Sequence, residues 1–121
     1  MTSVSTPLSR RPVDPPPGDD LRELTFAHDC REFVKRRDGM VHAMDGGLWL
    51  HRHVWKGRPM VHLVSTNRER LLAYGAAIGM PEDRLQYKPL KDPRTDERRD
   101  AWHWDLGGPV YPPPDERYAP R

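Results

Sequence analysis

Alternation of apolar and polar residues is clearest near the end of the chain, in the sequence AWHWDL. In an extended strand, successive side chains point to opposite faces. Trp102, Trp104 and Leu106 would therefore point into a core. His103 and Asp105 would lie side by side on the opposite face. The pattern predicts a strand that holds an imidazole beside a carboxylate.

Three further short apolar runs predict strands over residues 40–44, 48–53 and 60–65. The sequence Asp-Gly-Gly at 45–47 separates the first two runs. Asp-Gly between apolar runs is a hairpin signal, because glycine readily adopts the positive φ that tight turns require. We therefore expect the first two of these strands to form a β-hairpin.

A first helix is predicted upstream of these strands, ending near Asp38 with Gly39 as its stop. Its start is open, because Asp20 and Asp29 each begin a sequence with capping-box spacing. If the helix begins at Asp29, residues 24–26 would form a short strand before it. The apolar residues at helical spacing are Phe26, Ala27, Cys30, Phe33 and Val34.

A second helix is predicted over residues 66–78, where a capping box begins at Thr66 and Gly79 ends the apolar stripe. Gly75 lies within this helix and costs about 1 kcal/mol relative to alanine in an exposed helix. We expect that it permits close packing against a strand. Residues 82–85 predict a short additional turn of helix.

Composition limits the size of the folded region. The chain has 121 residues, of which 36% are hydrophobic, so one modest core is expected. Its 14 prolines are concentrated at the two ends. We expect one folded domain over residues 20–108, flanked by Pro-rich tails at 1–19 and 109–121. The predicted fold class is α+β, or small α/β, with about four short strands and two to three helices.

Charge and cysteine content exclude several classes of protein. The formal net charge is only +2, which gives no strong nucleic-acid signal. Cys30 is the single cysteine, so no internal disulfide can form, and a reducing compartment is expected. No run approaches the roughly 20 apolar residues of a membrane span. We expect a cytoplasmic protein that does not associate with membranes.

Histidine placement is the main functional clue. His51 and His53 share one face of a predicted strand, and His62 lies in the middle of the next. If these strands are neighbours of the last strand, their imidazoles could meet His103 and Asp105. Such a group suits a divalent metal ion such as Zn²⁺ or Mn²⁺, or an acid–base pair. The tentative metal ligands are His62, His103 and Asp105.

The same residues also have purely structural interpretations. The spacing matches no recognised metal motif, and the histidines could instead cap loops or bond backbone groups. Lys56, Arg58 and Lys88 could hold an anionic group, although basic loop residues are usually only solvated. Cys30 is expected to be a small core residue. Ser65 lacks the Gly-x-Ser-x-Gly context of a serine hydrolase.

Several short motifs follow one another along the chain: the sequence GRPMVHLVS at 57–65, a helix ending at Gly79, then Gln86, and His-Trp-Asp at 103–105. Together they resemble a small bacterial and phage family catalogued as a domain of unknown function. The resemblance covers about residues 48–106. It implies a compact α/β or α+β domain without an established activity, located in the host cytoplasm if the protein is phage-encoded.

The resemblance also implies a grouping of polar residues. It places in one site His62, Gln86, His103 and Asp105. His51 falls roughly where members of the family have an aspartate, and histidine can also be a ligand. Trp104 replaces the usual tyrosine, and Leu85 stands where an aromatic residue is common.

Three functional hypotheses follow from the sequence. The first is a binding module whose His/Asp pocket holds an anionic small molecule, a nucleotide or a protein partner. The second is a metal-dependent hydrolase or nuclease, in which His51 or His53 adds a further ligand or base to the three tentative metal ligands. The third is a non-catalytic component of a larger assembly, with Pro-rich tails that bind a partner.

Overall fold

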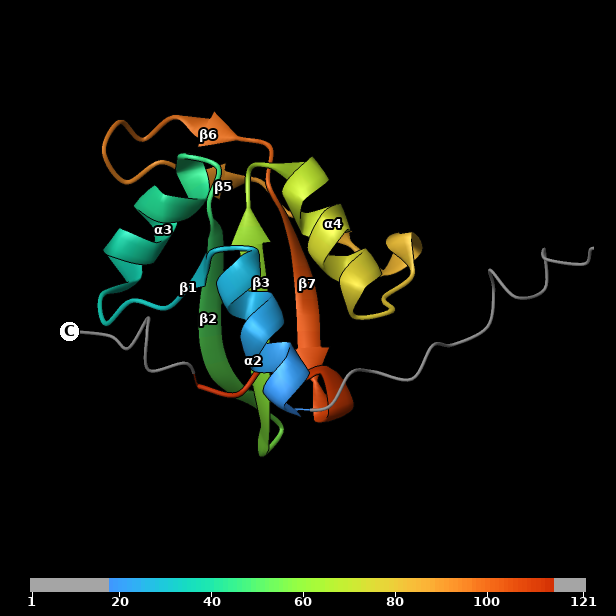
Figure 1. Cartoon of the computed structure of the whole chain (residues 1–121). Helices are drawn as coiled ribbons and strands as arrows, with labels where there is room; N and C mark the ends of the chain where they lie inside the picture. The colour runs from blue at the N-terminus through green and yellow to red at the C-terminus, as the bar shows by residue number, and fades with distance from the viewer. Residues whose placement is uncertain (1–17, 115–121) are drawn as a thin grey trace, which may run out of the picture.

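A computed structural model describes residues 18–114 of the chain. These residues form one α+β domain, which confirms the predicted fold class. The described part contains three α-helices, a five-stranded sheet and a separate two-stranded sheet (Figure 1). The expected Pro-rich tails fall largely on residues 1–17 and 115–121, which lie outside the described residues.

The elements follow one another along the chain with short connections. The α-helices are α2 (Gly18–Ala27), α3 (Arg36–Met44) and α4 (Arg68–Ala77). The strands are β1 (Cys30–Arg31), β2 (Leu48–Trp55), β3 (Arg58–Ser65), β4 (Gln86–Tyr87), β5 (Leu90–Lys91), β6 (Arg98–Arg99) and β7 (Trp102–Gly107). Two short 3-10 helices are η1 (Glu82–Arg84) and η2 (Gly108–Val110).

The order of strands in the larger sheet is β1-β2-β3-β7-β4. β1 runs parallel to β2, and every other neighbouring pair is antiparallel. His62 in the central strand lies directly opposite His51 on one side and Asp105 on the other. Gln86 of β4 lies opposite His103. Residues paired directly across strands point to the same face of a sheet, so this register gathers the polar residues on one face.

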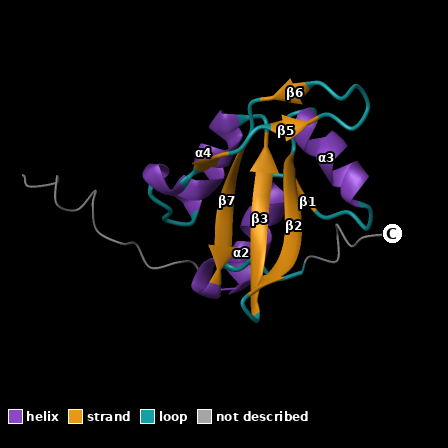
Figure 2. Cartoon of the chain, turned by 180° about the vertical axis from the view of Figure 1, so that it is seen from behind, coloured by secondary structure: helices purple, strands orange, loops and turns teal. Residues whose placement is uncertain are grey.

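The opposite face of the sheet carries the hydrophobic core. Helices α2 and α4 cover this face (Figure 1). Fully buried side chains there include Leu48, Val61, Leu63, Trp104 and Leu106. Seen from behind, β2, β3 and β7 are not covered by α2 or α4 (Figure 2). The alternation predicted for the last strand is therefore present: Trp104 and Leu106 are fully buried in the core, and Trp102 is partly buried against it.

The first helix differs from its prediction. The chain forms helix α2, which ends at Ala27, and Asp29 then adopts a positive φ of 56° that breaks the helical path before β1. Residues 24–26 are part of that helix and not a strand. The apolar stripe that predicted a helix ending near Asp38 therefore spans a helix end, a short strand and a turn.

The predicted strand at 40–44 is wrong, because these residues belong to helix α3. A five-residue apolar run has the length of a strand, but a buried helix segment gives the same signal. Gly39 does not stop a helix but lies within this one. A Cβ at this position would lie 2.0 Å from Nε1 of Trp49, so glycine allows the helix to pack directly on the indole.

The predicted hairpin turn is also misplaced. The Asp-Gly-Gly sequence at 45–47 connects helix α3 to strand β2. The hairpin turn lies instead between β2 and β3, at Lys56 and Gly57, whose φ angles are 50° and 77°. Two consecutive positive φ angles are characteristic of the type I′ turn that best fits the twist of a two-residue hairpin.

Helix α4 confirms the second helix prediction with a small shift at its start. Asn67, and not Thr66, is the N-cap, and its side chain accepts a hydrogen bond from the backbone N–H of Arg70. The hydroxyl of Thr66 instead donates to the carbonyl of Ala43 at 2.8 Å. This bond connects the start of α4 to the end of α3.

Gly75 permits the close packing expected of it. A Cβ on this residue would lie 2.2 Å from Cζ2 of Trp104. The indole Nε1 of Trp104 donates a hydrogen bond of 2.7 Å to the carbonyl of Leu71, one turn earlier in the same helix. Close packing against Gly75 and the hydrogen bond to Leu71 therefore fix the buried indole. The indole in turn positions β7 beneath α4.

The described chain packs onto the domain beyond residue 108, the expected end of the folded region. Pro112 is fully buried, and its carbonyl accepts a hydrogen bond of 2.7 Å from Arg52. The guanidinium of Arg52 also lies 5.2 Å from the ring centroid of Tyr111. Across residues 18–114, no helix has the length and apolar character needed to cross a membrane.

Replacing Gly75 by alanine tests the helix–strand contact. We expect Gly75→Ala to lower the free energy of unfolding by about 1–3 kcal/mol, the usual cost of overpacking. This loss would exceed the roughly 1 kcal/mol by which alanine favours an exposed helix over glycine. Urea denaturation measures the change. The control is Ala73→Gly on the exposed side of the same helix, which loses only the propensity difference; an unfolding energy raised by Gly75→Ala would contradict the packing argument.

Candidate functional site

Polar side chains from three neighbouring strands gather on the sheet face opposite α2 and α4. We call this surface the histidine face and define it by His51, His53, His62, His103 and Asp105. The residues come from β2, β3 and β7, and the pleat of each strand points them the same way. The structure therefore brings together imidazoles that are up to 52 residues apart in the sequence.

Asp105 lies at the centre of the closest contacts. Its Oδ1 atom is 3.0 Å from Nε2 of His62 and 3.3 Å from Nε2 of His103. Its other oxygen, Oδ2, accepts a 2.6 Å hydrogen bond from the side-chain amide of Gln86. The amide fixes the rotation of the carboxylate, so that one oxygen faces the two imidazoles.

The arrangement leaves that oxygen without a normal hydrogen bond. Oδ1 of Asp105 is buried, yet neither imidazole donates to it with hydrogen-bonding geometry. A buried oxygen acceptor without a donor is costly, and a bound cation would remove the cost. Metal–ligand bonds of ~2.0–2.2 Å in a tetrahedral zinc site separate the ligand atoms by roughly 3.3 Å. Both Asp105–histidine distances are close to this value.

The three ligand atoms form a compact group. One atom from each of His62, His103 and Asp105 lies within 4.8 Å of the other two. His62 and His103 have ring centroids 4.8 Å apart. Modest side-chain rotation would bring both nitrogens to bonding distance of one ion. The residues present therefore fit a divalent metal.

Burial favours the neutral form of the central imidazoles. It lowers the pKa of His62 to about 4, with a further contribution from the neighbouring His53, and the nearby Asp105 carboxylate opposes this only in part. Burial also lowers the pKa of His103, which is only 9% exposed. Both rings are thus neutral at neutral pH. Neutral imidazole is the form that binds metals.

His53 and His51 extend the same surface along β2. The ring of His53 lies 4.1 Å from that of His62, and its buried Nε2 has no hydrogen-bond partner among the described residues. His51 is farther away, 6.3 Å from the His62 ring, and stacks on Trp49 at 4.7 Å. Burial and then the charge of Arg36 lower the pKa of His51.

An open cleft of about 560 Å³ lies over the histidine face. This volume lies within the range of small-molecule sites. The histidine face and Gln86 form the floor of the cleft. The remaining lining residues are Arg36, Trp49, Val64, Lys88 and Leu90.

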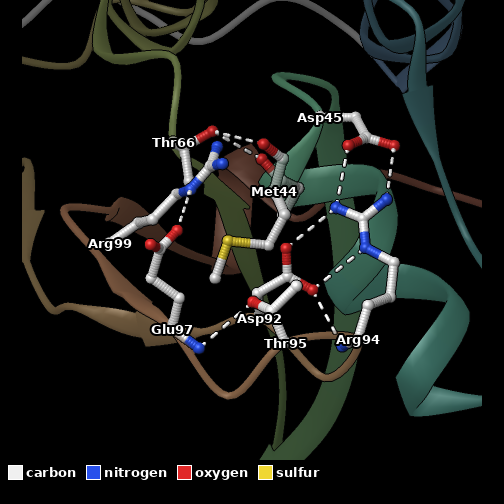
Figure 3. Close-up of polar contacts among 9 residues, drawn as sticks. Met44, Asp45, Thr66, Asp92, Arg94, Thr95, Glu97 and Arg99 are labelled. Carbon is white, nitrogen blue, oxygen red and sulfur yellow. Dashed lines mark hydrogen bonds and ion pairs between the residues drawn. The ribbon is translucent and has the colours of Figure 1, made fainter.

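One side of the cleft is formed by the loop region that carries β5 and β6. An ion-pair network around the buried Asp92 and the more exposed Arg94 and Asp45 connects this region to the domain. The guanidinium of Arg94 binds both oxygens of Asp92, with nitrogen–oxygen distances of 3.0 Å, and also binds Asp45 at the end of α3 (Figure 3). The backbone N–H of Arg94 donates to Asp92 as well. The network connects the β5–β6 hairpin to the turn between α3 and β2.

The structure separates the three basic residues that the sequence nominated as anion contacts. Lys88 lines the cleft, but Lys56 and Arg58 lie at the β2–β3 turn and are not among its lining residues. Arg36, which begins α3 and lines the cleft, is not among the site residues that the sequence nominated, because a short arginine pair such as Arg36-Arg37 is usually solvated surface. Only the placement of that helix beside β2 could have identified it. Cys30 is fully buried in the core, as expected.

Comparisons with known proteins add no relative. No protein-family model, no curated protein and no solved structure matches this chain. The resemblance to a bacterial and phage family of unknown function therefore stays a prediction.

The Asp92–Arg94 network predicts an acid-sensitive contribution to stability. Hydrogen bonds from Arg94 lower the pKa of Asp92 from 3.8 to about 2 in the folded protein. The ionised carboxylate therefore contributes stability above pH 4, and this contribution is lost as the pH falls towards 2. Asp92→Asn should lower the free energy of unfolding at pH 7 and reduce its fall between pH 4 and pH 2. Urea titrations at several pH values measure both effects.

The control for this experiment is Asp83→Asn, which removes a carboxyl group from the exposed η1 turn, outside the Arg94 network. An identical fall in stability for the wild type and Asp92→Asn between pH 4 and pH 2 would show that the network does not contribute in this way.

Proposed function

We propose that this protein binds a divalent metal ion through His62, His103 and Asp105, and that the metal centre receives a small anionic ligand in the cleft above it. The observation that carries the proposal is the convergence of two imidazole nitrogens on one buried, undonated carboxylate oxygen. The ligand atoms of His62, His103 and Asp105 lie close enough together for one ion to contact all three.

The donor set favours a transition metal. Two imidazoles and one carboxylate suit Zn²⁺ or Mn²⁺, and the same set also suits Fe²⁺. Three protein ligands leave at least one coordination position for a molecule from the cleft. Gln86 acts behind the ligands by orienting Asp105, as partners of metal ligands commonly do.

The charge of the cleft favours an anion. Arg36 and Lys88 are the cationic side chains of its lining, and Asp105 is the acidic one. A divalent ion at the three ligands would neutralise that carboxylate and leave the lining strongly positive. An anionic ligand is therefore a better match than a cation or a neutral molecule.

Metal titration tests the proposal. We expect the purified chain to bind one Zn²⁺ or Mn²⁺ and to melt at a higher temperature with the metal, since binding to the native state alone adds stability. His62→Ala, His103→Ala and Asp105→Ala should each weaken binding by more than about 100-fold, because even partners behind metal ligands account for roughly 10–100-fold. Gln86→Ala should fall within that smaller range.

The matched control removes a histidine outside the histidine face. His28→Gln should bind the metal as the wild type does, because His28 packs edge-on to Tyr74 in another part of the domain. Elemental analysis gives the stoichiometry, and competition with a chromogenic chelator gives the affinity. A wild-type chain that takes up no Zn²⁺, Mn²⁺ or Fe²⁺ would end the proposal.

A metal-dependent hydrolase is a second candidate, favoured by the unpartnered Nε2 of His53 beside His62. A bound ion would supply Lewis-acid chemistry. His53, which lines the cleft, would contribute an imidazole to hydrogen-bond a water or a reacting group there. A buried polar atom kept without a partner at such a place is typical of functional sites.

Hydrolysis of p-nitrophenyl phosphate by the metal-loaded protein tests this second candidate. We expect His53→Gln to lower kcat by at least about tenfold, within the usual scale of proton-transfer groups, while metal stoichiometry stays unchanged. His28→Gln serves again as the control. Measurable metal binding without any metal-dependent hydrolysis would leave the binding function and remove the enzymatic one.

A further inference from the structure

We propose that the cleft binds a phosphate monoester, with the phosphate group held between the metal and Lys88 and with Arg36 providing a second cation at the β2 side of the cleft. This inference rests on the proposed metal site and specifies its ligand. It is carried by the positions of two cationic side chains on opposite sides of the histidine face.

Lys88 lies at the β4 side of the histidine face. It follows the two-residue strand that pairs with β7, and its backbone N–H donates to the carbonyl of Ala101 at 2.8 Å. Its ammonium charge is close enough to contribute to the lowered pKa of His103. Among residues 18–114, no acidic side chain forms an ion pair with Lys88, which is exposed and lines the cleft.

Arg36 lies at the opposite side, where α3 passes β2. Its guanidinium carbon is 5.7 Å from the ring centroid of Trp49, and its charge contributes to the lowered pKa of His51. Within the described part of the chain it too forms no ion pair. A cation–π contact with an indole does not occupy the N–H donors of the guanidinium, which remain available to a ligand.

The histidine face therefore lies between two cations without acidic partners. The register places His51, His62 and Asp105 in one row across the sheet, while Lys88 follows β4 on the far side of β7 and Arg36 begins α3 beside β2. A metal at the central residues would lie near Lys88, with Arg36 farther along. This sequence of positive centres requires a ligand with more than one negatively charged oxygen.

A phosphate monoester meets this requirement better than a carboxylate. It is close to a dianion near neutral pH and carries three terminal oxygens, so it can contact the metal and Lys88 at the same time. A carboxylate has one charge and two oxygens. Val64 and Leu90 add apolar surface to the cleft for the organic part of an ester. The cleft volume of about 560 Å³ has room for a phosphorylated small molecule.

Calorimetric titration of the Zn²⁺-loaded full chain with phenyl phosphate tests the inference. Benzoate is the carboxylate counterpart, with the same ring and a single charge, and inorganic phosphate shows what the ester group adds. Lys88→Ala should weaken phenyl phosphate binding by at least about tenfold, the scale of one charge-assisted hydrogen bond. Arg36→Ala should weaken it to a smaller extent.

The control is Arg58→Ala, which removes an exposed cation from β3 outside the cleft. It should bind phenyl phosphate as the wild type does. The Zn²⁺ affinity of every variant is measured separately and should be unchanged, since none of these residues is a ligand.

The outcomes separate the two proposals. A chain that binds Zn²⁺ but not phenyl phosphate overturns the phosphate inference and leaves the metal site standing. Benzoate binding as tight as phenyl phosphate binding, or an equal loss in Lys88→Ala and Arg58→Ala, overturns it as well. A chain that binds no metal fails at the earlier step, which the separate metal titration reveals.

Discussion

The register of β3 between its two neighbours is the constraint on which the rest of the structure depends. His62 is paired on one side with His51 and on the other with Asp105. Because side chains alternate along a strand, a slip of one residue would turn His62 into the core and Val61 out of it. The same pairing that buries the aliphatic residues beneath α2 and α4 therefore assembles the polar face.

The polar face is costly for the fold. It holds weakly basic, partly buried imidazoles around a carboxylate whose inward oxygen receives no hydrogen bond. Natural proteins depart from full polar satisfaction mainly where function requires it. The core provides the compensating stability on the other side of the same strands, where Trp104 fills the space against Gly75. The hydrophobic core and the histidine face thus lie on opposite faces of the same sheet.

The local periodicity of apolar residues was sufficient to predict the elements that bury one face of a long strand or helix. The alternation around Trp104 and the amphipathic pattern of α4 were predictable for this reason. The segment containing Gly39 was not, because its glycine serves contact with Trp49, a partner in another element, and not a helix stop. For the site, histidine spacing indicated which residues share a face. The position of Arg36 depends on how α3 docks, which no local pattern encodes.

The network around Arg94 has a consequence for access to the cleft. One guanidinium joins the β5–β6 hairpin, through Asp92, to the end of α3, through Asp45. The β5–β6 hairpin and the end of α3, which border the opening of the cleft, are therefore connected to each other as well as to the sheet. A single side chain therefore sets the spacing between the two edges of the opening.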